Sequence, residues 1–307
     1  MKTNEINIRD PYILHHQDKY YLYGTRSATT WGLADGFDCY VSDDMENWEG
    51  PIEIFHNNGE FWADRNYWAP ECYYYRGSFY LVATFNAEDK NMGTQILIAD
   101  LPTGPFKPHS DGPVTPKGWN CLDGTLYFGA DGTPYMIFGH SFEDNPNGEM
   151  CMAELSPDLK MAIGEPKCLF KASTAPWTVP VPFAKQAFGI DGDVYFVDGP
   201  CLYKNKSGIL LMLWSSWGQT GYTVGIAISD NGEVDGNWRH QEVPFYSENG
   251  GHGMLFRDKE NNMLFAMHYP NDLYKERPRF IKVKETNTTL TAFTEEIEVA
   301  VGQGTSK

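Results

Sequence analysis

The chain has 307 residues, 41% hydrophobic and 15% aromatic, so it is long enough to bury a sizeable core. Its formal net charge is −17, from 24 lysines and arginines against 41 aspartates and glutamates, and this balance argues against nucleic acid as a partner. No stretch approaches the ~20 apolar residues that cross a bilayer, which predicts a protein without a membrane span.

The first predicted element is a β-like run at residues 7–13, in which one acidic residue, Asp10, stands just before a proline. Apolar runs follow at 20–24 and 38–42, and the last of these leads into an acidic turn before Trp48. Such a turn is typical of the closing end of a propeller blade, because Asp and Asn side chains bond back to the backbone. We expect Trp48 to anchor the blade core rather than to stack on a sugar.

The same pattern, a β-like run with a marked residue near its start and a further apolar run after it, returns four more times, at Pro70, Asp123, Asp198 and His252. The intervals of roughly 50 to 75 residues have the size of a repeat built from short strands and turns. Five copies predict an all-β fold, a single five-bladed β-propeller domain over residues 1–307. The first strand of each blade lines the central funnel, so we expect Asp10 and the two later aspartates to converge on an active site there.

The later blades are expected at 67–110, at 120–170, at 195–245 and from His252 onward. The proline-rich connection at 171–194 is expected to shape the mouth of the funnel, with Trp177 as its exposed aromatic. No helix is predicted. Alternating apolar residues at 297–301 suggest a closing strand, and whether N- and C-terminal strands share a blade stays open.

The six cysteines are spread singly, with no CxxC pair, and are expected to be small buried hydrophobes. Residues 1–5 carry no apolar segment, which predicts a cytoplasmic protein as the chain stands. A periplasmic or secreted location is expected if a signal peptide precedes this sequence. No pattern in the sequence indicates an oligomeric state.

Taken in order, one per blade, the motifs resemble glycoside hydrolase family 43, five-bladed glycosidases that act mainly on arabinose- and xylose-containing glycans. The resemblance covers most of the chain. Its carriers are Arg9-Asp10-Pro11, Trp68-Ala69-Pro70-Glu71, Leu122-Asp123-Gly124, Asp198-Gly199-Pro200, Gly251-His252-Gly253-Met254-Leu255-Phe256-Arg257, Met267-His268-Tyr269-Pro270-Asn271 and Glu276-Arg277-Pro278.

An inverting glycosidase needs a base that activates water and an acid that protonates the leaving oxygen, with the two carboxyl groups ~6.5–9.5 Å apart. The resemblance implies Asp10 as the general base, Asp123 as the carboxylate that raises the pKa of the acid, and Asp198 as the acid. The family usually presents Glu-Gly-Pro at this last position, so the acid here is one methylene shorter. Glu71 and Glu143 are the alternative acids.

The resemblance also implies that His252 holds a cation or water in the channel. Calcium is the metal to consider, no organic cofactor is expected, and a buried histidine with satisfied hydrogen bonds is the alternative. Trp68 and Arg277 match substrate-binding positions, and each has a packing or ion-pair role as its alternative. Trp217 is a further substrate-binding candidate near the end of an inner strand.

These residues predict an inverting glycosidase of the α-L-arabinofuranosidase or β-xylosidase type, acting on plant oligosaccharides or polysaccharides. Exo action is expected if the connection at 171–194 walls off the funnel. The alternative is a non-catalytic glycan-binding propeller, which the short acid at position 198 favours. The start motif of fructosidase-type propellers is absent, and the funnel shows little of the basic cluster that a phosphorylase needs.

Overall fold

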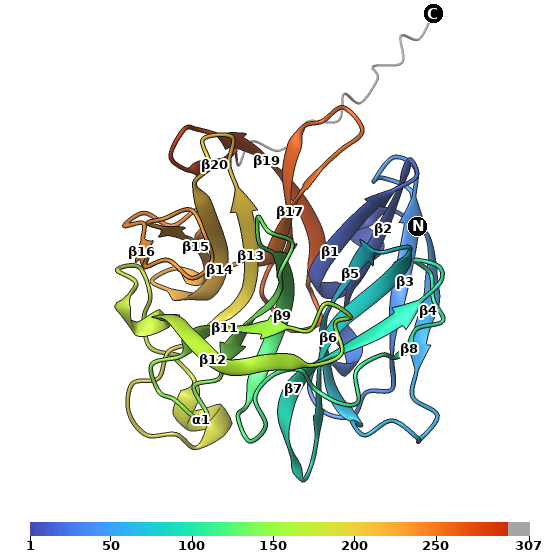
Figure 1. The fold of residues 1–307 in the computed structure, drawn as a ribbon, viewed down its shortest axis with the longest axis horizontal. Coiled ribbons are helices and arrows are strands. Elements are labelled where there is room, and N and C mark those ends of the chain that lie inside the picture. Colours follow the sequence, from blue (N-terminus) through green and yellow to red (C-terminus); the bar gives the residue numbers. More distant parts are fainter. Residues whose placement is uncertain (294–307) are drawn as a thin grey trace, which may run out of the picture.

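The computed structural model describes residues 1–293, which form five four-stranded antiparallel sheets around a central axis (Figure 1). The first two blades contain β1 (Ile8–His16), β2 (Lys19–Arg26), β3 (Gly36–Ser42) and β4 (Glu49–His56), then β5 (Arg65–Tyr75), β6 (Ser78–Ala87), β7 (Lys90–Ala99) and β8 (Lys107–Pro108). The third contains β9 (Cys121–Phe128), β10 (Pro134–His140), β11 (Glu149–Leu155) and β12 (Ala162–Lys171). The last two contain β13 (Asp198–Lys204), β14 (Leu210–Gly218), β15 (Gly221–Ser229) and β16 (Trp238–His240), then β17 (Gly251–Arg257), β18 (Met263–Tyr269), β19 (Arg277–Glu285) and β20 (Leu290–Phe293). The predicted five-bladed propeller is confirmed.

Every innermost strand carries a bulge near its start, where the pairing with the next strand skips. The first bulged residue has a positive φ in each blade, and these residues are Asp10, Ala69, Asp123, Gly199 and His252. Bulges of this kind re-aim a side chain, and here they turn three side chains that carry chemistry toward the axis. The counterpart of Asp10 in the fourth blade is therefore Gly199, and Asp198 stands one residue before it.

Hydrophobic clusters fill the spaces between neighbouring blades and close the ring between the last blade and the first. In that last interface Trp48 is 3% exposed and packs with Ile8, Phe256 and Leu264, as predicted for a blade-core anchor. Asp44 accepts hydrogen bonds from the backbone N–H groups of Glu46 and Asn47 and so forms the predicted acidic turn. Each blade is thus held by its neighbours, which fixes the innermost strands around the channel.

Within residues 1–293 every blade consists of four strands consecutive in sequence, so the first and last blades share no strand. The 3₁₀ helix η1 (Thr3–Glu5) packs against β19, and the N-terminal ammonium donates to the carbonyl of Trp48 at 2.8 Å. The closing strand predicted at 297–301 lies outside the described residues.

The connection at 171–194 contains the 3₁₀ helix η3 (Ala172–Thr174) and the short helix α1 (Ala184–Phe188), and another 3₁₀ helix, η2, spans Ser27–Thr29. The prediction of no helix was therefore wrong. Gly189 ends α1 with a φ of 69°, a conformation that favours glycine. The connection pairs with β14 at Thr178–Gly218, so it lies at the end of the propeller where β13 begins, as expected.

Trp177 is 6% exposed, and the prediction that it is an exposed aromatic was wrong. Its ring centroid lies 4.8 Å from that of Trp214. It fits there because Gly225 has no side chain, and a Cβ at Gly225 would overlap the indole. The missing side chain on β15 therefore lets the connection bury its tryptophan in the interface between blades three and four.

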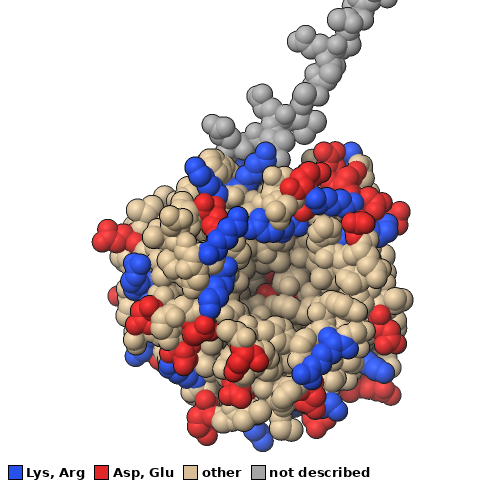
Figure 2. All heavy atoms as spheres, turned by 45° about the horizontal axis from the view of Figure 1, so that its top comes forward, with Lys and Arg blue, Asp and Glu red and all other residues tan. Residues whose placement is uncertain are grey.

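Figure 2 shows the end of the propeller that lies at the top of Figure 1. This face is hollowed at its centre, acidic residues are visible within the hollow, and lysines and arginines gather along part of the rim.

In residues 1–293, none of the helices has the length and apolar character required to cross a membrane.

Candidate active site

The three predicted carboxylates and the predicted histidine meet in one small recess, and each of the five innermost strands contributes at least one residue to its lining. Asp10 lies on β1, Asp123 on β9, Asp198 on β13 and His252 on β17. The remaining lining residues are Arg9, Thr30, Trp31, Trp68, Leu122 and Phe196. The convergence expected from the repeat is present.

His252 lies at the centre of the three carboxylates and is 7% exposed. Its Nδ1 atom is 3.4 Å from Asp10 Oδ1, 3.7 Å from Asp123 Oδ2 and 3.8 Å from Asp198 Oδ2. Burial alone would lower the pKa of His252, but its interactions with Asp10, Asp123 and Asp198 outweigh the burial and raise the pKa to about 10. The ring is therefore an imidazolium at neutral pH and supplies a positive charge to the carboxylates.

Asp10 is held as an ionised carboxylate. Burial raises its pKa, but the positive charges of His252 and the nearby Arg9 hold the pKa well below its usual range. Thr25 donates its hydroxyl hydrogen to Asp10 Oδ2 at 2.6 Å, and the backbone N–H of Asp10 donates to His268 Nδ1 at 3.2 Å. An ionised carboxylate with fixed oxygens is what a general base requires.

Asp123 has the opposite electrostatic character. Burial raises its pKa, the charge on His252 lowers it, and the neighbouring carboxylates of Asp198 and Asp10 raise it further, to about 8. Its backbone N–H donates to Thr84 Oγ1 at 2.7 Å. The site thus contains one carboxyl group that is ionised at neutral pH beside another that keeps its proton. Two neighbouring carboxyl groups whose pKa values are pushed apart in this way are typical of acid–base sites.

Asp198 is oriented by a tyrosine on the third strand of its own blade. The hydroxyl of Tyr222 lies 2.6 Å from Oδ1 and 2.5 Å from Oδ2 of Asp198. The following residue, Gly199, lies against His252, and a Cβ there would be 2.9 Å from the imidazole ring.

The distance between the proposed base and the proposed acid is limited by their shared neighbour. Asp10 Oδ1 lies 3.4 Å and Asp198 Oδ2 lies 3.8 Å from His252 Nδ1, so these two oxygens can be no farther apart than the sum of those distances. That bound excludes the wider part of the ~6.5–9.5 Å range of inverting enzymes and admits the narrower part.

The two alternative acids lie outside the recess lining. Glu71 is 9% exposed, two residues beyond the bulge of β5, and burial raises its pKa to about 7. It accepts a hydrogen bond from Tyr73, whose hydroxyl also contacts Thr125 Oγ1 at 2.7 Å. Glu143 is exposed in the turn after β10. Neither carboxyl group joins the cluster around the histidine.

One side of the recess is aromatic. Trp68 donates its indole N–H to the carbonyl of Thr30 at 2.5 Å, and the ring of Trp31 meets it edge-on with centroids 5.2 Å apart. Trp31 is 55% exposed and was missed by the sequence reasoning, since it stands in the connection between β2 and β3 of the first blade rather than in a repeated motif. Both tryptophans line the recess, so the substrate-binding prediction for Trp68 is compatible with its place.

Arg277 and Trp217, the other predicted substrate-binding residues, do not line the recess. Arg277 donates to the carbonyls of Asn4 at 3.0 Å and Glu276 at 2.8 Å. Trp217 is half-buried and meets Phe183 of the long connection edge-on, with centroids 5.1 Å apart. Their contact with substrate stays a prediction.

Sequence reasoning also missed the residues that hold the carboxylates in place. Arg9 forms an ion pair with the buried Glu276 at 2.7 Å, and its place in the sequence directly before Asp10 was the available signal. Tyr222 lies on the third strand of its blade, outside every motif, and His268 lies on the second strand of its blade in the motif at 267–271, where the sequence analysis assigned it no role. Their role depends on strand pairing, which the sequence does not specify.

The resemblance implies a cation at His252, and Ca²⁺ is the metal to consider. Donor atoms of Asp123, Asp198 and His252 lie within 4.8 Å of one another. The two carboxyl groups suit a cation, but the imidazolium of His252 would have to lose its proton before it could be a ligand. Because Ca²⁺ prefers ~6–8 oxygen ligands, water would also have to complete the shell. The cation stays a prediction.

The profile of the glycosyl hydrolases family 43 matches residues 4–294. The chain belongs to this family. The members of this family are, as its name states, enzymes that hydrolyse glycosyl bonds.

Two curated relatives are named after arabinan chemistry. The chain is 27% identical over 152 residues to an extracellular endo-α-(1→5)-L-arabinanase of Bacillus subtilis (strain 168). It is 25% identical over 153 residues to an extracellular exo-α-(1→5)-L-arabinofuranosidase of Cellvibrio japonicus (strain Ueda107). Each match covers 45% of this chain, and 44% and 42% of the two relatives.

Among solved structures, an endo-arabinase from Bacteroides thetaiotaomicron VPI-5482 is similar over 94% of this chain and 98% of its own. The TM-score is 0.86 and the sequence identity is 33%. A thermostable family-43 glycoside hydrolase shares the fold, with a TM-score of 0.79 and 22% identity over 95% of this chain and 96% of its own.

Proposed function

We propose that the chain is an inverting glycosidase that acts on arabinose-containing polysaccharides or oligosaccharides of plants. The observation that supports this most is the gathering of Asp10, Asp123 and Asp198 around His252 in a member of a glycosidase family. The similarity to an endo-arabinase at 33% identity supports arabinan as the substrate. A β-xylosidase activity is the second candidate within the same reaction class.

In the proposed reaction, the ionised Asp10 takes a proton from water while the water oxygen bonds to the anomeric carbon. The bond between that carbon and the leaving oxygen breaks, and Asp198 gives its proton to the leaving oxygen. Asp10 therefore ends protonated and Asp198 ends ionised, and solvent restores both. Because Asp198 is one methylene shorter than the family's usual glutamate, the substrate has to lie closer to β13.

Asp123 and His252 are assigned to electrostatics rather than to proton transfer with the substrate. Donor atoms of Asp123 and Asp198 lie within 4.8 Å of each other, and the proton that Asp123 keeps limits the negative charge of the cluster. His252 supplies a fixed positive charge that keeps Asp10 ionised. A Ca²⁺ held by His252 and the two later aspartates would require a neutral His252, so the ion would supply the positive charge in place of the imidazolium.

The aromatic side of the recess offers a surface for a sugar ring. The C–H face of a sugar packs on an indole, while the hydroxyl groups need polar partners. Trp31 and Trp68 supply the apolar surface, and Arg9 and Thr30 lie beside them in the lining.

Secretion or export to the periplasm is supported by the names of the two curated relatives, which describe extracellular enzymes. The partner is a carbohydrate substrate. A glycan-binding propeller without turnover is the candidate from another class, and the short acid at Asp198 favours it.

A screen of substrates tests the proposal. The purified protein is incubated with nitrophenyl arabinofuranoside, xyloside and galactoside and with arabinan and xylan oligosaccharides. We expect release of arabinose or arabino-oligosaccharides, and the product lengths distinguish exo from endo action. Binding of arabinan or xylan fragments in calorimetry, without cleavage of any substrate, would contradict the enzyme proposal.

A further inference from the structure

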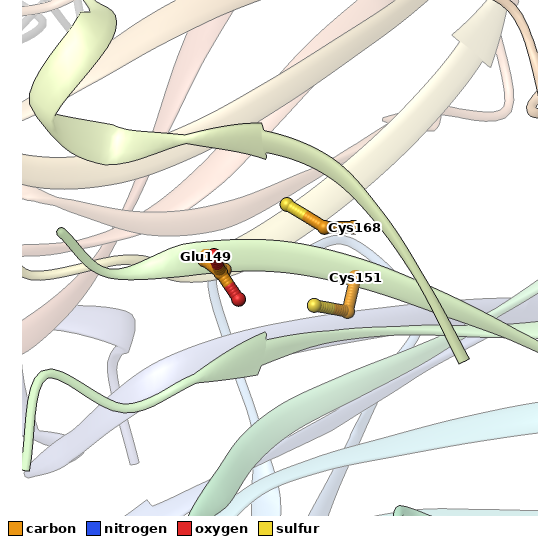
Figure 3. A group of neighbouring side chains, drawn as sticks. All are labelled: Glu149, Cys151 and Cys168. Atoms are coloured by element: carbon orange, nitrogen blue, oxygen red, sulfur yellow. The ribbon is translucent and has the colours of Figure 1, made fainter. Parts of the chain in front are cut away.

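Three metal-ligating side chains meet on the third blade, away from the recess (Figure 3). Glu149 and Cys151 lie two residues apart on β11, so both point to the same face of the sheet. Cys168 on β12 is the cross-strand partner of Cys151. One donor atom from each residue lies within 4.8 Å of the other two. The sequence analysis treated these two cysteines as isolated because they lie 17 residues apart in the chain.

A β-bulge produces this pairing. Met150 pairs with Phe170 and Cys151 with Cys168, so the register skips Leu169. In a regular ladder Leu169 would stand opposite Cys151 and place an apolar side chain beside it. The bulge instead presents the second thiol, which is the way bulges commonly re-aim side chains at functional positions.

The surroundings suit a cation. His140 Nδ1 lies 3.4 Å from Glu149 Oε2, and the His140 ring is stacked on Trp119 with centroids 4.2 Å apart, which fixes one carboxylate oxygen. The other oxygen, Oε1, lies 3.8 Å from the ammonium of Lys171, whose exposed side chain has to turn away when a cation binds. Cys151 is buried and Cys168 is exposed, which leaves a path from solvent to the thiols.

We propose that Cys151, Cys168 and Glu149 bind one Zn²⁺ ion, with water as the fourth ligand. With Zn–S near 2.3 Å and Zn–O near 2.0–2.2 Å, the ligands of a tetrahedral zinc site lie ~3.5–3.8 Å apart, which the observed grouping can accommodate with small rotamer changes. Binding releases the thiol protons to solvent. The ion would join β12, the exposed edge strand of the blade, to β11.

Zinc binding to the reduced, metal-stripped protein tests the proposal. We expect one equivalent of zinc to bind in competition with a chelating dye and to raise the melting temperature, because the ion binds the native state. Cobalt in place of zinc should give a thiolate-to-metal charge-transfer band, which a site without cysteine cannot produce. Cys168→Ser should remove the band, and Glu149→Gln should weaken zinc binding at least ~10-fold.

Cys201→Ser is the matched control, since Cys201 is a half-buried thiol in another blade, and it should bind zinc like the wild type. Zinc binding that survives Cys168→Ser unchanged would place the ion elsewhere and overturn the proposal. A reduced protein that binds no zinc, and whose two thiols are instead lost to a disulfide on mild oxidation, would also overturn it.

Discussion

The hydroxyl of Tyr222 contacts both carboxylate oxygens of Asp198, at 2.6 and 2.5 Å, within the buried part of the recess. A short side chain used as an acid tolerates little rotation, because proton transfer needs ~2.6–3.2 Å between heavy atoms. The tyrosine therefore stands where it can compensate for the methylene that the aspartate lacks.

We predict that Tyr222→Phe lowers kcat on arabino-oligosaccharides by about 10- to 100-fold, because the acid loses its orientation. Nitrophenyl arabinofuranoside should be affected less, since nitrophenolate leaves without a proton. The ratio of the two rates is the measurement. Equal losses on both substrates, or none on either, would assign the tyrosine a structural role only.

Replacement of Asp198, the proposed acid, distinguishes the hypothesis of an enzyme from that of a glycan-binding module. Asp198→Ala should slow natural oligosaccharides far more than aryl glycosides, because a sugar alkoxide needs the proton in the transition state. Asp198→Glu should lower the rate if the aspartate works in a site adapted to it. A rate raised by the glutamate would mean that the wild-type acid is degenerate, and an alanine variant as fast as the wild type would transfer the role to Glu71 or Glu143.

The raised pKa of Asp123 predicts a pH-dependent stability. The folded state binds this proton up to about pH 8, whereas the unfolded state releases it near ~3.9, so its stabilising contribution is complete below ~3.9 and is lost as pH rises through about 8. We expect the free energy of unfolding to fall between pH 5 and pH 8 in the wild type and to fall less in Asp123→Asn. Urea unfolding at several pH values measures this, and equal slopes would contradict a buried protonated carboxyl group.

The cation predicted at His252 is tested with calcium added to metal-stripped protein. Millimolar Ca²⁺ should raise the melting temperature of the wild type and leave that of His252→Gln unchanged, because a ligand of the native state stabilises it. Calcium avoids the thiol site, since it prefers oxygen ligands. Equal responses of the two proteins would leave His252 as a charged residue without a metal role.

The fold could be predicted from the sequence because each blade repeats the same local pattern, an apolar strand with a turn-forming residue at a fixed place. The same repeat located Asp10, Asp123 and His252, each of which is the positive-φ residue of a bulge. In the second and fourth blades the markers taken from the sequence, Pro70 and Asp198, were one residue away from the structural counterparts. Asp198 reaches the recess from this neighbouring position.

The rest depended on contacts that no local pattern encodes. Trp177 was expected at the surface, and it is buried because a glycine on another strand leaves room for it. Tyr222 reaches Asp198 across two strand pairings, and the pairing of Cys151 with Cys168 requires a bulge whose position the sequence does not mark. These relationships arise from register, which neighbouring strands decide together.

The most direct test of the account compares the wild type with Asp10→Asn on arabinan oligosaccharides, following product release and measuring binding by calorimetry. The amide is nearly isosteric with the carboxylate but cannot take the proton of the attacking water, so we predict a fall in kcat of at least ~10³-fold with nearly unchanged affinity. A variant that keeps more than about a tenth of the wild-type rate would contradict the assignment of Asp10 as the base, and with it the proposed mechanism.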